Sequence, residues 1–130
     1  MDTKLQQEIY NSILKLLKEY SPPFEVREGK NVSDKDSLGL WKTGEFEAFG
    51  RKRSEIYFAG VIKQKAYVGF YFMPIYAELD KMKKNISPQL LKTLKGKSCF
   101  YIKTNDPSLM TDIKHLLAEG FKLYKQLGWV

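Results

Sequence analysis

The chain has 130 residues, of which 43% are hydrophobic and 14% aromatic, and it carries a formal net charge of +7. This length supports one hydrophobic core, so a single domain over residues 1–130 is expected. The lone Cys99 excludes an internal disulfide, and every apolar run is shorter than the roughly 20 residues that cross a bilayer. The N-terminal segment lacks the pattern of a secretory signal, so the sequence predicts a soluble, cytoplasmic protein with no membrane partner.

The positive charge is concentrated in the last third of the chain. Residues 81–130 hold 10 Lys or Arg against 3 Asp or Glu, whereas residues 1–50 hold 7 against 9. No acidic residue lies between Lys81 and Asn105. Such a bias attracts nucleic acid, acidic lipid or phosphorylated ligands, although a lysine-rich face is also a common way to keep a protein in solution.

The N-terminal segment has the pattern of an amphipathic helix. Apolar residues recur every three or four positions along residues 4–20, and Thr3 with Gln6 has the spacing of a capping box. The helix is expected to end before Ser21-Pro22-Pro23, because proline cannot continue the helical hydrogen-bond ladder.

The next segment changes from irregular composition to a strand-like period. Residues 24–42 mix Gly, Asn, Asp, Ser and Lys, which predicts irregular chain with one short strand at residues 24–27. Over residues 44–72 apolar side chains alternate with others, interrupted at residues 50–54 and 63–65. This pattern predicts a three-stranded antiparallel meander.

Two kinds of aromatic residue separate within this meander. Phenylalanines and tyrosines fall on opposite strand parities, so a phenylalanine face that meets the helices leaves a tyrosine face directed outward or into a groove. The phenylalanines are Phe58, Phe70 and Phe72, and the tyrosines are Tyr57, Tyr67 and Tyr71.

The C-terminal third contains two helix starts with a strand between them. Ser87-Pro88 reads as an N-cap followed by proline at the first helical position, and predicts a short helix to Leu94. Residues 98–103 read as a strand. Asp106-Pro107 repeats the cap-and-proline signal before an amphipathic helix over residues 107–127.

These segments together resemble the YdhG-like family of small bacterial domains of unknown function. The resemblance covers residues 56–130, and it implies an α+β fold in which the N- and C-terminal helices pack on one side of an antiparallel sheet of about five strands. That two-layer arrangement is similar to the frataxin-like sandwich. The residues that carry it are Val68-Gly69-Phe70-Tyr71, Ser87-Pro88 leading into Leu94-Lys95-Gly96-Lys97, the strand 98–103, and Leu127-Gly128-Trp129.

The likeness to frataxin also implies iron handling, which some relatives are linked to. Iron is held by clustered oxygen ligands. Glu8 and Glu19 are eleven residues apart on the expected first helix, about 16 Å at the helical rise, and cannot share an ion. Glu45 and Glu47 have the same strand parity, so an iron chaperone would use this pair.

Residues that usually mark an enzyme are scarce. His115 is the only histidine and has no Cys or His at ligand spacing, and Cys99 lies among aromatic residues of a strand, where free cysteine usually acts as a small buried hydrophobe. The chain has neither a Gly-rich phosphate loop nor a Gly-x-Ser-x-Gly motif. No catalytic or metal-binding residue is therefore predicted, and the sequence indicates no particular cofactor.

Lysines flank the aromatic strands of the C-terminal half. Charge beside stacking surfaces is the combination that holds single-stranded nucleic acid or phosphorylated small molecules. Lys97, Lys103, Tyr71 and Tyr76 are predicted to bind such an anionic ligand, although tyrosines also commonly fill space between sheet and loops. The expected function is a non-catalytic binding or accessory protein. The alternatives are an iron-binding chaperone and a homodimer formed through the exposed sheet face.

Overall fold

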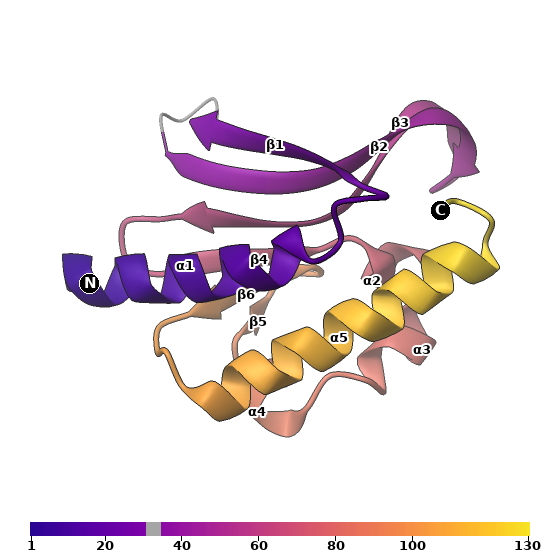
Figure 1. Cartoon of the computed structure of the whole chain (residues 1–130). Helices are drawn as coiled ribbons and strands as arrows, with labels where there is room; N and C mark the ends of the chain where they lie inside the picture. The colour runs from indigo at the N-terminus through magenta and orange to yellow at the C-terminus, as the bar shows by residue number, and fades with distance from the viewer. Residues whose placement is uncertain (31–34) are drawn as a thin grey trace.

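An antiparallel sheet and a layer of helices make up the structure, a computed structural model that describes residues 1–30 and 35–130 (Figure 1). The two long helices are α1 (Thr3–Lys18) and α5 (Pro107–Gln126), and three short ones are α2 (Pro74–Ala77), α3 (Leu79–Lys83) and α4 (Pro88–Leu91). The described strands are β1 (Glu25–Lys30), β2 (Asp36–Ala48), β3 (Arg51–Lys63), β4 (Val68–Phe72), β5 (Leu94–Lys95) and β6 (Cys99–Ile102).

Sheet order confirms the predicted two-layer α+β class. The strands lie in the order β1-β2-β3-β4-β6-β5, and every neighbouring pair is antiparallel. The described residues thus form six strands rather than the expected five. The additional strand is the two-residue β5. Strands β1 and β2 correspond to the strand expected at residues 24–27 and to the first strand of the meander, and β2 begins at Asp36 rather than at residue 44.

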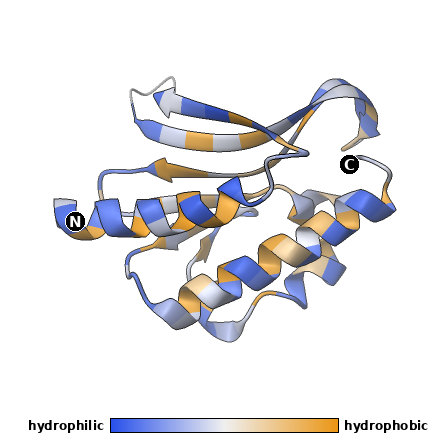
Figure 2. Ribbon diagram, viewed as in Figure 1, coloured by the Kyte–Doolittle hydropathy of each residue, from blue (hydrophilic) through white to orange (hydrophobic). Residues whose placement is uncertain are grey.

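Both long helices turn their apolar sides toward the same face of the sheet, as the colouring of Figure 2 shows. Helix α1 buries Ile9, Ile13 and Leu17, while α5 buries a longer stripe that includes Ile113 and Leu117. These side chains meet the phenylalanines predicted to face the helices: Phe58, Phe70 and Phe72 are fully buried. The buried apolar side chains form one cluster, which holds the two layers together.

Capping residues define where the helices begin. The Asp2 carboxylate accepts a hydrogen bond from the Leu5 amide at 3.0 Å, so Asp2 and not Thr3 is the N-cap of α1. An aspartate side chain caps as well as a hydroxyl does, which leaves Thr3 as the first helical residue. Ser87 and Asp106 cap α4 and α5, each followed by proline, as predicted.

The short strand expected at residues 24–27 is present as part of β1, but the prediction of irregular chain was wrong for most of the other described residues up to 42. Strand β1 pairs with β2 from Glu25↔Trp41 to Lys30↔Asp36, and residues 31–34 lie outside the described part. The alternation here is present but weak: Leu38 and Leu40 are buried, whereas Ser37 and Gly39 occupy the opposite face. Small residues on that face hid the two-residue period.

The β2–β3 hairpin turns earlier than its polar residues suggested. The turn consists of Phe49 and Gly50, with φ values of 54° and 82°, instead of residues 50–54. A pair of left-handed residues is typical of two-residue hairpin loops, where the first position usually holds Asn, Asp or Gly and a phenylalanine is unusual. The Phe49 ring packs 5.3 Å from that of Trp129, and this contact offsets the backbone strain.

Chain reversal near Gly96 creates strand β5. The helix expected to reach Leu94 ends at Leu91, and Leu94 and Lys95 instead pair with Phe100 and Cys99. Gly96 has a φ of 67°, a left-handed conformation that glycine adopts without steric cost. Residues Pro74–Lys83, for which no element was predicted, form α2 and α3.

Gly120 marks the closest approach of α5 to the sheet, and its replacement by alanine is expected to destabilise the fold. An added Cβ would lie 2.5 Å from Cζ of Phe72 and 2.9 Å from Cγ of Pro74. The overlap costs about 1–3 kcal/mol and outweighs the gain of about 1 kcal/mol in helix propensity. Urea denaturation of Gly120→Ala measures the change, with Ala118→Gly on the exposed side of α5 as the control for propensity. A variant more stable than the native chain would contradict this packing.

Alkaline pH is expected to destabilise the fold because it ionises buried tyrosines. Burial, with smaller contributions from Glu28 and Asp36, raises the pKa of Tyr10 to about 12. Burial also raises the pKa of Tyr20 and Tyr124. Each folded pKa exceeds the unfolded value of 10.0, so the tyrosines stabilise the fold fully below about pH 10 and progressively less as the pH rises toward about 12. Urea midpoints measured from about pH 8 to 12 should stay level up to about pH 10 and fall above it, and they should fall less steeply in Tyr10→Phe.

Candidate ligand-binding face of the sheet

The side of the sheet opposite α1 and α5 carries most of the partly exposed aromatic side chains. As predicted from parity, Tyr57, Tyr67 and Tyr71 lie on this side. The strand register places two further residues on this side of the sheet, because Trp41 pairs with Tyr57 and Cys99 pairs with Tyr71. The open face is defined here as Trp41, Tyr57, Tyr67, Tyr71, Cys99 and Tyr101.

Three glycines lie beneath the rings of this face. A Cβ on Gly69 would come within 2.9 Å of Cε2 of Tyr71, and one on Gly39 within 3.0 Å of Nε1 of Trp41. A Cβ on Gly60 would collide with the Tyr57 hydroxyl. The rings therefore lie across the backbone in space that ordinary side chains would fill, and they form a shallow aromatic surface over β2, β3 and β4.

Tyr67 and Tyr101 form a stacked pair at one end of the open face. Their ring centroids are 3.7 Å apart and their planes differ by 7°. A side-chain hydrogen bond with Tyr101, followed by burial, raises the pKa of Tyr67. Tyr67 therefore keeps its phenol proton at neutral pH, and the pair offers hydroxyl groups beside an apolar ring surface.

Cys99 occupies the middle of the open face and is half-buried rather than part of the core. Burial raises the pKa of its thiol, and a hydrogen bond with Tyr71 lowers it by less. A protonated thiol is a poor nucleophile and a poor metal ligand. Cys99 therefore contributes shape and apolar surface to the site.

Lysines border the open face at its β5–β6 edge. Lys92, Lys95 and Lys103 line a cavity of about 260 Å³ together with Tyr101, and no acidic residue lines it. These three lysines are called the basic edge below. In residues 1–30 and 35–130 the ion pairs use other cations, namely Lys18, Arg27, Lys30, Lys63 and Lys122. The basic edge thus presents positive charge directly beside the Tyr67–Tyr101 stack.

The structure divides the four predicted ligand residues between two places. Tyr71 lies on the open face and Lys103 on the basic edge. Tyr76 and Lys97 instead line a separate cavity of about 360 Å³ beside α2 and α3, where the Tyr76 and Ser98 hydroxyls are 3.3 Å apart. Tyr101 and Lys95 belong to the open side although the prediction did not select them, because their position depends on the β5–β6 pairing.

Metal-ligating side chains do not gather anywhere in the described part of the chain. No group of three His, Cys, Asp or Glu residues lies close enough there to hold a metal ion. Glu45 and Glu47 are both exposed and line a shallow cavity that also contains Lys52 and Arg53. His115 is exposed on α5.

Comparison of the chain with protein-family models, with curated proteins and with solved structures finds no match. The YdhG-like resemblance consequently stays a prediction from the sequence. None of the helices in the described ranges combines the length and apolar character that crossing a bilayer requires.

Alkylation of Cys99 is expected to be slow in the folded protein near neutral pH, because burial keeps the pKa of the thiol above its ordinary value of 9.0. Iodoacetamide labelling followed by mass spectrometry should show a rate that rises steadily above about pH 9. Tyr71→Phe removes the hydrogen bond that favours the thiolate, so this variant should react still more slowly. Labelling as fast as that of the urea-unfolded chain would contradict this environment.

Proposed function

We propose that this chain is a non-catalytic binding protein of the YdhG-like type and that its open face binds ligands in which a planar ring is joined to phosphate. Nucleotides and single-stranded nucleic acids share this chemistry. The supporting observation is the basic edge: three lysines without an acidic neighbour in their cavity lie beside a pair of stacked tyrosines. The raised pKa of Cys99 supports a role without catalysis.

Two physical contributions would act together at this site. Stacking of a base on an aromatic side chain contributes about 1–3 kcal/mol. The lysines are exposed, so each phosphate contact is partly screened by solvent and salt. Binding is therefore expected to combine a stacking component that survives high salt with an electrostatic component that does not.

Spacing of the lysines favours single strands over mononucleotides. Lys95 pairs with Cys99, and Lys103 lies four residues beyond Cys99 along the chain, so the two lysines are separated by about 13 Å in the strand direction. One phosphate group can contact both only if the two long side chains converge on it, which costs them conformational freedom. A ligand with several separated phosphates can use the whole edge, and we expect it to bind more tightly.

Charge reversal at the basic edge tests the electrostatic part of this proposal. Fluorescence anisotropy with a labelled single-stranded DNA of about 12 nucleotides should show binding that weakens at least tenfold between about 0.05 and 0.3 M salt. The double variant Lys95→Glu/Lys103→Glu should abolish it. Lys15→Glu/Lys114→Glu changes the net charge equally at exposed helix positions and should bind nearly as the native chain does. Equal loss of DNA binding in both variants would show that binding depends only on net charge, and it would contradict the proposed site.

Ring replacement at Tyr101 tests the stacking part. Tyr101→Leu removes the π-surface and should weaken DNA binding by about 5- to 100-fold, which corresponds to the loss of one stacking interaction. Tyr101→Phe keeps the ring and should bind within about threefold of the native chain. Competition by mononucleotides in the same assay shows whether the site prefers free nucleotides or single-stranded nucleic acid. If Tyr101→Leu binds as tightly as Tyr101→Phe, bases do not stack at this position.

A further inference from the structure

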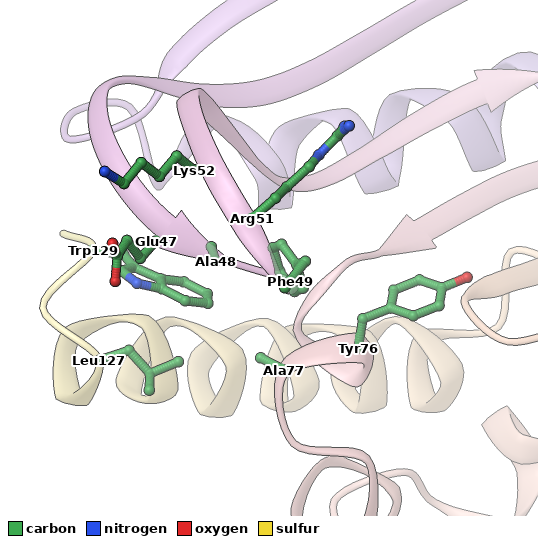
Figure 3. Close-up of a pocket in the computed structure, with 10 residues that line it drawn as sticks. Glu47, Ala48, Phe49, Arg51, Lys52, Tyr76, Ala77, Leu127 and Trp129 are labelled. Atoms are coloured by element: carbon green, nitrogen blue, oxygen red, sulfur yellow. The ribbon is translucent and has the colours of Figure 1, made fainter.

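Exposed apolar side chains gather at one end of the sheet. Five large hydrophobic residues of the described chain are more than 40% exposed, and three of them lie together: Tyr76 at 47%, Leu79 at 51% and Leu127 at 41%. Figure 3 shows Tyr76 and Leu127 beside the β2–β3 hairpin tip. The other two, Met1 and Leu91, do not line this region.

These three side chains line two adjoining cavities that share Tyr76. One cavity of about 630 Å³ lies between the hairpin tip, α2 and the C-terminal residues Leu127 and Trp129 (Figure 3). The other, of about 360 Å³, lies between α2, α3 and the turn at Gly96. The two are called the Tyr76 groove. Tyr76 stands between them and divides the groove into two apolar hollows.

Positive charge surrounds the Tyr76 groove. Arg51 and Lys52 border the larger cavity, and Lys83 and Lys97 border the smaller one, against one acidic residue, Glu47. None of these four cations forms an ion pair with a side chain of the described residues. An occupant that complements the groove therefore carries acidic groups around apolar anchors.

The wall formed by the hairpin tip and the C-terminus is held in place before anything binds. The Trp129 ring packs 4.9 Å from that of Tyr124 and 5.3 Å from that of Phe49. The Trp129 amide also donates to the Tyr124 carbonyl at 2.9 Å. A prearranged wall lowers the ordering cost that binding has to overcome.

We infer that the Tyr76 groove is a docking site for an acidic segment of a partner protein, with one apolar anchor in each hollow and carboxylates opposite the four cations. Of the three exposed apolar side chains only Tyr76 carries a ring on which a base could stack, whereas Leu79 and Leu127 suit apolar side chains of a protein, so the groove favours a protein segment over nucleic acid. A lipid surface would need apolar side chains on a convex part of the molecule, whereas these line hollows. The net charge of +7 disfavours a second copy of this chain.

A set of three labelled synthetic peptides of equal length tests this inference. The first alternates glutamate with leucine and phenylalanine, the second replaces glutamate by lysine, and the third replaces the apolar residues by serine. Fluorescence anisotropy at moderate salt should show binding of the first peptide only, with the third at least about tenfold weaker. If the lysine peptide binds as well as the glutamate peptide, or if the glutamate peptide does not bind, the inference is wrong.

Matched variants locate the site. Leu79→Ser and Leu127→Ser should each weaken binding of the first peptide by about tenfold, and Lys97→Glu should do the same. Leu91→Ser changes a leucine that is 46% exposed outside the groove, so it should leave binding within about twofold. Circular dichroism checks that each variant is folded, as we expect for substitutions at exposed positions.

Three results would overturn the inference. The Leu91→Ser variant could weaken binding as much as Leu79→Ser does, which would indicate a non-specific apolar effect. The Lys95→Glu/Lys103→Glu variant of the basic edge could abolish peptide binding, which would move the site to the open face. Light scattering could show a dimer that Leu127→Ser dissociates, which would make a second copy the occupant.

Discussion

A cluster of rings around Phe58 holds the helices against one side of the sheet, and this packing decides which side stays open. Phe58 stacks on Phe24 at 4.6 Å and meets Tyr124 at 5.2 Å and Phe72 at 6.2 Å. The Tyr124 hydroxyl also donates to the Tyr57 carbonyl at 2.8 Å, which fixes α5 to the backbone of β3. Aromatic pairs of this kind stabilise beyond their buried area, so the layers cannot easily shift. With that side filled, the tyrosines of opposite parity are left to form a surface.

The elements with strong local signals could be predicted from the sequence. The capping residues Ser87 and Asp106, each followed by proline, marked helices, and the alternation of phenylalanine with tyrosine in β3 and β4 assigned the two faces correctly. The N-terminal part of β2 was missed because Ser37 and Gly39 give its outward face little character, and β1 was predicted shorter than it is. The function was not readable in this way, since it depends on surfaces that no local motif marks.

Pairing between distant segments accounts for the rest of what the sequence did not predict. Lys95 reaches the open face only because β5 pairs with β6. The turn at Gly96 then reverses the chain, so that Lys95 borders one surface and Lys97 the other. Two lysines separated by a single residue therefore belong to different sites, and the sequence presented them as one basic cluster. The two proposed sites, the open face and the Tyr76 groove, consequently share neither of these cations.

The glycines under the open face determine its shape although they contribute no side chains to it. Its flatness is set by Gly39, Gly60 and Gly69, the three positions that contribute no side chain. Replacement by alanine normally removes atoms and leaves a gap, but at these positions it would add atoms and tilt the ring above. In an alanine scan of this surface, the most sensitive positions are therefore expected to include these three glycines, which project no side chain from the sheet.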